Sequence, residues 1–114
     1  MAIVTAGDRR FDLVQVGQGR DCVMLHSLLT DRTVFDPVVP ALARGRRLTL
    51  VNQPGWGQSS PGGPAIEDYA DQLAALFPAL RLAPAATDLV AMSFGGFAGI
   101  ALAARHGHLF DRLV

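Results

Sequence analysis

The sequence predicts an α/β fold, with a mostly parallel sheet that carries helices on both faces. Three observations lead to this prediction. Segments with helical periodicity alternate with short apolar runs along the 114 residues, and such alternation is typical of successive strand–helix units. The run 22–25 is apolar at every position, as in strands that are buried on both faces of a parallel sheet. Half of the residues are hydrophobic, which is enough to build one core.

The chain begins with two strand candidates that can pair as an antiparallel hairpin. Residues 3–5 form the first, and Gly7-Asp8 is a turn. Residues 11–16 form the second, which Gly17 and Gly19 terminate. The hairpin is followed by the apolar run described above, which is the third predicted strand.

A helix is predicted over residues 33–43, where apolar side chains recur at helical spacing. Asp31 or Thr33 can serve as its N-cap. Pro37 fits the first helical turn, whereas Pro40 should distort the helix because proline lacks a backbone N–H.

The clearest helix runs from about residue 65 to residue 80, with seven apolar or aromatic side chains at helical spacing. Glu67 and Asp68 lie near its N-terminus, where acidic charge is favoured, and Pro78 should end or kink it. The remaining predicted elements are strands at 47–52, 88–92 and 112–114, and a helix at 94–105 that is followed by Gly107 as a C-cap.

Composition excludes several classes of function. The formal net charge is zero, and all ten basic residues are arginines that are scattered along the chain, so neither nucleic acid nor an anionic membrane is an expected partner. Cys22 is the only cysteine, which fits a reducing compartment. No secretory signal or membrane-spanning apolar run is evident. We therefore expect a soluble cytoplasmic protein without a metal or another cofactor.

One motif carries chemistry: Ala91-Met92-Ser93-Phe94-Gly95-Gly96 lies where an apolar strand turns into a helix. A serine there needs a sharp turn that presents its hydroxyl above the sheet edge, and small residues on either side relieve the crowding. The helix that begins at Phe94 directs its N-terminus at the serine, where developing negative charge is stabilised.

Two further motifs give this serine a context. His26-Ser27-Leu28 follows the third strand, and the loop from Asn52 to Ser59 reads NQPGWGQS after the fourth. In order and spacing, the three motifs together resemble the serine-nucleophile branch of the α/β-hydrolase family. The resemblance covers strands one to five of that fold and the beginning of strand six, so it implies an incomplete α/β-hydrolase domain over residues 1–114 that lacks the C-terminal half.

The resemblance implies roles for five residues. Ser93 would be the catalytic nucleophile, and the backbone N–H groups of Leu28 and Phe94 would form the oxyanion hole. His26 and Ser27 would support the oxyanion loop. The family usually has glycine at the position of Ser27, so a serine would be strained there if that position requires a positive φ.

Another departure from the family pattern occurs at Asn52, where the family commonly has aspartate. We interpret this position as one that fixes its loop. Trp56, in the same loop, either packs against its neighbours or lines the substrate entrance.

A base and an acid should follow the nucleophile in this family, but only 21 residues follow Ser93. Asp111 precedes the last strand and should lie at the opposite end of the sheet. His106 and His108 come after a helix of about 12 residues, which rises roughly 18 Å, so neither should reach the serine. His26 is the alternative base, although a loop-supporting role fits it better.

Two functions follow. In the first, the full-length parent protein is an acyl hydrolase that acts on a small-molecule ester, thioester or lactone. The chain as given would be inactive, because the acid and the histidine of the triad are missing. The second is a non-catalytic fragment or interaction module. Its last strands would leave an apolar sheet edge unpaired, and a partner chain or self-association would cover that edge.

Overall fold

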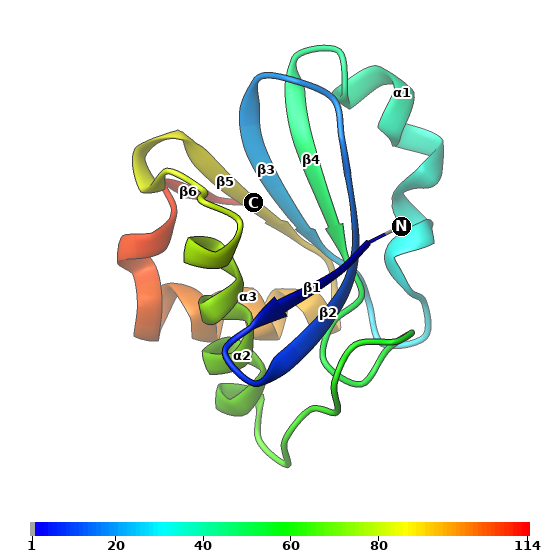
Figure 1. Ribbon diagram of the computed structural model, residues 1–114. Helices are drawn as coiled ribbons and strands as arrows, with labels where there is room; N and C mark the ends of the chain where they lie inside the picture. Colours follow the sequence, from blue (N-terminus) through cyan, green and yellow to red (C-terminus); the bar gives the residue numbers. More distant parts are fainter. Residues whose placement is uncertain (1) are drawn as a thin grey trace.

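The computed structural model describes residues 2–114, which form a six-stranded sheet with helices on both sides (Figure 1). The strand order across the sheet is β1-β2-β4-β3-β5-β6. The strands are β1 (Ala2–Ala6), β2 (Arg9–Val16), β3 (Arg20–Leu25), β4 (Arg46–Val51), β5 (Thr87–Ala91) and β6 (Arg112–Leu113).

The predicted sheet is confirmed, since only its first two pairings are antiparallel. β1 pairs with β2 and β2 with β4 in antiparallel fashion, whereas β4, β3, β5 and β6 run parallel. Leu25 is in register with both Val51 and Ala91. The central strands therefore end at the same level, and the loops that follow them leave the sheet at one edge.

Helices α2 (Ile66–Ala79) and α3 (Phe94–His106) pack against each other on one face of the sheet, and α1 (Val39–Leu42) covers part of the other face (Figure 1). Each face has its own hydrophobic cluster. The cluster under α2 and α3 includes Phe11, Leu73, Phe77, Leu89 and Leu102, and the cluster under α1 comprises Cys22, Met24, Phe35, Leu48 and Leu50. Burying each large side chain contributes about 1.5–3 kcal/mol.

The predicted helix at 33–43 is two short pieces. The 3₁₀ segment η1 (Arg32–Val38) precedes the single turn of α1. Asp31 caps η1, since its carboxylate accepts the Thr33 N–H at 2.9 Å. Pro40 lies in the first turn of α1, where a missing N–H costs nothing. The second proline thus starts a new helix, rather than distorting one continuous helix.

The two long helices match their predicted ranges to within one residue at each end. Pro78 lies in the last turn of α2, which ends one residue later. Gly107 occupies the C-cap of α3 with a φ of −60°. This conformation is open to any residue, so the C-cap does not require a glycine here. The short 3₁₀ segments η2 (Pro84–Ala86) and η3 (Gly107–Leu109) connect α2 to β5 and α3 to β6.

Charged side chains join the amino ends of the parallel strands. Asp88 at the start of β5 is only 5% exposed, and its carboxylate accepts two hydrogen bonds of 2.8 Å from Arg20 and one of 2.9 Å from Arg46. Arg20 also pairs with Asp111 at 2.7 Å. Hydrogen bonds from the two arginines hold the pKa of Asp88 well below its usual range.

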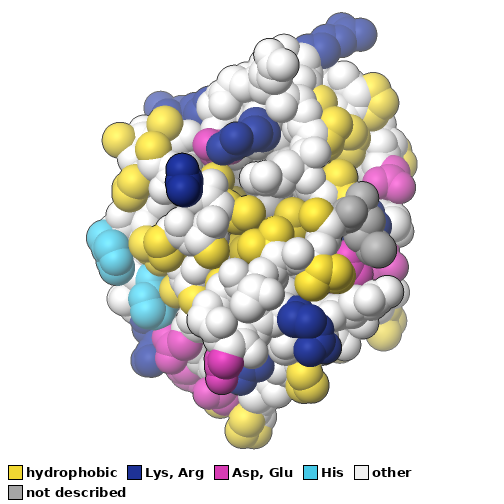
Figure 2. All heavy atoms as spheres, viewed as in Figure 1, with side chains coloured by type: hydrophobic (Ala, Val, Ile, Leu, Met, Phe, Trp, Pro, Cys, Tyr) yellow, Lys and Arg dark blue, Asp and Glu magenta, His cyan; other side chains and the backbone are white. Residues whose placement is uncertain are grey.

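The surface mixes apolar and charged side chains. Hydrophobic side chains gather near the middle of the face in Figure 2, and arginines on that face stand apart from one another. Several large apolar residues of α3 and the last strand are exposed: Phe97 (66%), Ile100 (63%), Leu113 (38%) and Val114 (78%). Within residues 2–114, no helix has the length and apolar character needed to cross a membrane.

Candidate active site

The turn between β5 and α3 gives Ser93 an unusual backbone. Its φ is 52° and its ψ is −116°, and among the described non-glycine residues only Arg81 shares a positive φ. Non-glycine residues in such regions are strained by about 1–3 kcal/mol, and this kind of strain gathers at functional sites. The side chain is exposed, and no hydrogen bond recorded within residues 2–114 engages its hydroxyl. The sharp turn predicted from the motif is therefore present.

Gly95 explains why small residues surround this serine. A Cβ at Gly95 would lie 2.6 Å from the carbonyl oxygens of both Leu25 and His26, because α3 begins directly against the end of β3. The Met92 N–H also donates to the Leu25 carbonyl at 3.1 Å. The turn at Ser93 and the loop after β3 are thus locked together by backbone contacts.

The two predicted oxyanion donors come to the same edge of the sheet. Phe94 is the first residue of α3, and the first N–H groups of a helix have no partner within it. Leu28 lies in the loop that follows the adjacent parallel strand β3, with 53% of its surface exposed. Their joint role as an oxyanion hole stays a prediction.

His26 is completely buried and both ring nitrogens are used. Its Nε2 accepts the backbone N–H of Gln53 at 3.0 Å, which leaves Nδ1 as the donor to the Ser27 carbonyl at 2.9 Å. Burial lowers the pKa of His26, which favours the neutral ring. This geometry is that of a loop support, since neither nitrogen is free to take a proton from Ser93.

Ser27 is accommodated without the expected strain. Its φ is not in the positive range, since Ser93 and Arg81 are the only described non-glycine residues there. Its hydroxyl lies 2.9 Å from the hydroxyl of Thr30, and its carbonyl accepts the Thr30 N–H at 3.4 Å. The side-chain pair closes the turn that follows β3.

Gln53 is a site residue that the sequence did not single out. Its side chain is fully buried and its Nε2 donates to the His26 carbonyl at 2.6 Å. Together with its backbone N–H, it holds the histidine from two sides. One clue in the sequence was its position in the loop after β4. This strand pairs with β3, and His26 directly follows β3.

Four rings gather beside the turn at Ser93. Trp56 lies with its ring centroid 5.2 Å from that of His26 and 5.5 Å from that of Phe94. Tyr69 from α2 stands perpendicular to Phe94 at 5.5 Å. Such offset and edge contacts contribute about 0.5–1.5 kcal/mol each beyond their burial. Tyr69 therefore belongs to this aromatic cluster as well as to the hydrophobic face of α2.

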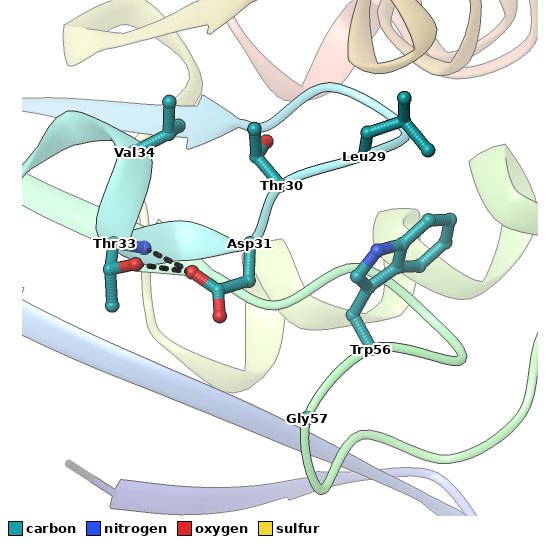
Figure 3. Close-up of a pocket in the computed structure, with 7 residues that line it drawn as sticks. All are labelled: Leu29, Thr30, Asp31, Thr33, Val34, Trp56 and Gly57. Carbon is teal, nitrogen blue, oxygen red and sulfur yellow. Dashed lines mark hydrogen bonds between the residues drawn. The ribbon is translucent and has the colours of Figure 1, made fainter.

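Trp56 also borders a hollow of about 440 Å³. In Figure 3 its indole faces the hollow from one side, and Asp31 and Thr33 border the other. Hydrogen bonds from Thr33 lower the pKa of Asp31. Trp56 thus packs against its neighbours and also lines a hollow next to the predicted oxyanion loop. Its place at a substrate entrance stays a prediction. The lining residues are Leu29, Thr30, Asp31, Thr33, Val34, Trp56 and Gly57.

His106 and Asp111 lie away from Ser93, as the sequence predicted. His106 is at the far end of α3, where its Nε2 lies 2.7 Å from a carboxylate oxygen of Asp71. Asp111 donates its backbone N–H to Thr87 at the start of β5, whereas Ser93 follows the end of that strand. The described residues also contain no cluster of three metal-ligating side chains.

Comparisons with known proteins agree with this geometry. The family model described as the alpha/beta hydrolase fold matches residues 23–114. The pimeloyl-[acyl-carrier protein] methyl ester esterase of Aeromonas hydrophila is 33% identical over 101 residues, which are 86% of this chain and 37% of that protein. The esterase of the same name from Aromatoleum aromaticum is 34% identical over 94 residues, with coverages of 82% and 35%.

A solved structure is similar over almost the whole chain. E-2-(acetamidomethylene)succinate hydrolase superimposes with a TM-score of 0.90 and 26% identity, over 98% of this chain and 42% of that one. This chain spans little more than a third of the length of the curated esterases that it matches. The family match, the curated relatives and the shared fold agree, and the chain belongs to the alpha/beta hydrolase fold family.

Proposed function

We propose that this chain supplies the nucleophile half of a serine hydrolase that acts on small carboxylic esters. The backbone of Ser93 carries the proposal, since a strained serine between a parallel strand and a helix N-terminus is what a nucleophile turn requires. Thioesters and lactones belong to the same acyl class. The two related methyl ester esterases named above favour an ester.

The proposed reaction has two steps. The Ser93 oxygen attacks the ester carbonyl carbon while a base takes the hydroxyl proton. The ester C–O bond then breaks, and the leaving oxygen takes that proton and departs as the alcohol. In the second step water gives a proton to the base and attacks the acyl-serine carbonyl. The bond to the Ser93 oxygen breaks, the carboxylic acid leaves, and the proton returns to the Ser93 oxygen. The N–H groups of Leu28 and Phe94 would stabilise the oxyanion in both steps, and losing one such donor typically costs about 10²–10³ in rate.

In the described part of the chain, neither His26 nor His106 is placed to act as the base of this reaction. His26 is engaged through both nitrogens, and His106 lies at the opposite end of α3. We infer that a histidine and an acid from further chain, or from a partner chain, complete the site, and that residues 1–114 alone form an inactive domain.

An activated aryl ester tests this proposal. The purified 114-residue chain should show equal turnover for wild type and Ser93→Ala, because a serine without a base is a weak nucleophile. Thr5→Ala, an exposed hydroxyl on β1, serves as the control. A form of the protein completed with a histidine and an acid should show turnover that Ser93→Ala abolishes. Ser93-dependent turnover by the 114-residue chain would instead identify His26 as the base.

The alternative is a non-catalytic interaction module, which the exposed apolar side chains favour. β6 pairs only with β5 and is the last strand of the sheet, and Phe97 and Ile100 project from the neighbouring helix with 66% and 63% exposure. Such edges recruit other chains. Sedimentation of the purified chain should show mass that rises with concentration, and Phe97→Glu should reduce it. A strictly monomeric chain would count against the module.

A further inference from the structure

Asp12 is a buried carboxylate on β2 that none of the sequence motifs includes. It is 3% exposed, although strand residues with charged side chains usually face water. A buried carboxylate needs several partners to compensate for lost hydration. The partners of Asp12 come from two loops of the candidate site, and this double attachment is the basis of the inference.

The loop that carries Trp56 supplies the first set of partners. The side-chain amide of Asn52 donates to Asp12 Oδ2 at 3.0 Å, and the backbone N–H of Gln58 donates to the same oxygen at 3.1 Å. The backbone takes part as well, since the Asn52 N–H donates to the Asp12 carbonyl at 2.9 Å. The Asp12 N–H donates in turn to Ser59 Oγ at 2.9 Å. These bonds hold the residues on both sides of Trp56.

The segment after β3 supplies the second set. The Nε of Arg32 lies 3.9 Å from Asp12 Oδ1, and both atoms are buried without a hydrogen-bond partner among residues 2–114. The backbone N–H of Arg32 donates to Asn52 Oδ1 at 2.9 Å. Asn52 thus lies between the carboxylate and Arg32, and it bonds to both.

Gly57 shows how closely this anchor is packed. It has a φ of 53°, and a Cβ at this position would meet Asp12 Oδ2 at 2.5 Å and overlap the Asn52 amide. The turn that presents Trp56 therefore closes directly over the carboxylate. Only a residue without a side chain fits between them.

We propose that Asp12 is a positioning residue that joins the two loops and holds Trp56 beside the nucleophile turn. Trp56 contacts His26 and Phe94 through its ring, so its place bears on the loop support and on one predicted oxyanion donor. The anchor also explains the amide at position 52. An aspartate there could not donate to Asp12, and two carboxylates would face each other at the 3.0 Å that now separates donor and acceptor. The catalytic relevance rests on the proposed function, whereas the geometry of the anchor does not.

Trp56 is the only tryptophan in the sequence, so its fluorescence reports on this loop directly. In the 114-residue chain, Asn52→Asp should shift the emission to longer wavelength and raise acrylamide quenching several-fold, with the far-UV circular dichroism unchanged. Asp12→Asn should change both in the same direction but less, because it leaves Arg32 without its charge partner. Adding Asp12→Asn to Asn52→Asp should reduce the effect of the latter, since it removes the carboxylate repulsion.

Asp21→Asn is the matched control. Asp21 also pairs with one arginine, Arg47, but at the amino ends of β3 and β4, so its loss should leave Trp56 emission unchanged. The proposal is overturned if Asp12→Asn keeps wild-type emission and quenching, if Asp21→Asn shifts them equally, or if the effects of the double variant are additive. Should Asn52→Asp fail to fold, the double variant decides: recovered circular dichroism supports the contact, and no recovery refutes it.

The fluorescence result and ester turnover separate the two proposals. A Trp56 shift in a protein that never shows Ser93-dependent turnover would leave the Asp12 anchor in place and remove the hydrolase function. Where turnover is found, Asp12→Asn should lower kcat/KM while the Asp21→Asn control does not.

Discussion

Ser93 has a backbone conformation that serine seldom adopts, and this has a measurable consequence for stability. Its φ of 52° implies strain of about 1–3 kcal/mol, held in place by the surrounding fold. Ser93→Gly should relieve that strain, whereas Ser93→Ala should keep it. Urea unfolding should therefore find Ser93→Gly more stable than Ser93→Ala, although the greater entropy of glycine in the unfolded chain offsets about 0.5–1 kcal/mol of the gain. A glycine variant that is less stable than Ser93→Ala by about 0.5–1 kcal/mol, which is the entropy cost alone, would show that the turn is not strained.

Gly95 and Gly96 form a matched pair of adjacent glycines in one helix. Ala at 95 would place its Cβ 2.6 Å from two backbone carbonyl oxygens, while a Cβ at 96 meets nothing within 4 Å. We expect Gly95→Ala to cost about 1–3 kcal/mol through overpacking. Gly96→Ala should be neutral or stabilise by about 0.5–1 kcal/mol. Chemical denaturation of both variants checks this, and similar values for the two would contradict it.

At the residue scale, the sequence predicted the sharp turn at Ser93 and the loop-fixing place of Asn52 because both follow from local patterns. It did not predict the roles of Asp12 and Gln53. Asp12 lies within an alternating strand and looks like a solvent-facing residue, and its partners are 20 to 47 positions away in the chain. Contacts between residues so far apart in the sequence leave no recognisable pattern within a short segment.

The elements were predicted well where periodicity was long and uninterrupted. α2 has an apolar stripe over 14 residues, which is enough to define its face. The prediction of one helix at 33–43 was the least accurate. The two prolines of this segment each remove an N–H, and only short helical turns form over residues 32–42. The sequence showed both prolines but not which backbone pattern would satisfy the remaining N–H groups.

A charged cluster joins the two long helices. Arg105 of α3 makes two hydrogen bonds to Asp71 of α2, at 2.8 and 2.9 Å, and His106 adds a third. These bonds hold the pKa of Asp71 well below its ordinary value of 3.8. The ion pair should stabilise the fold above that pH, and the stabilisation should fade as the pH falls toward the lowered pKa.

We expect Asp71→Asn to lower stability slightly at neutral pH, since the pair is exposed to solvent. The difference from wild type should shrink with added salt and as the pH is lowered below 3.8. Urea titrations at several pH values measure this. Asp36→Asn, an exposed acid that takes no part in an ion pair within residues 2–114, is the control. A pH-independent difference would show that the charge has no part in joining the helices.

At the scale of the whole molecule, Asp88 connects three parallel strands and reaches the fourth through Arg20 and Asp111. Asp88→Asn should cost about 2 kcal/mol at neutral pH, as expected when hydrogen bonds to a charged group are lost. Because the pKa of Asp88 is lowered, wild type should lose this advantage only in acid, below the ordinary value of 3.8. Thermal unfolding of both proteins from neutral to acidic pH tests this, and a neutral-pH cost no larger than that of Asp21→Asn would refute it.

The strand order has a consequence for the order of events during folding. β3 lies between β4 and β5, so its second neighbour is separated from it by the whole of α2. Pairings between distant segments form slowly, because a long loop must close first. The Met92–Leu25 backbone bond is among these late contacts. Ser93 therefore obtains its positive φ and its exposed position only when β5 docks, so the sharp turn at Ser93 forms late, after the sheet around it has assembled.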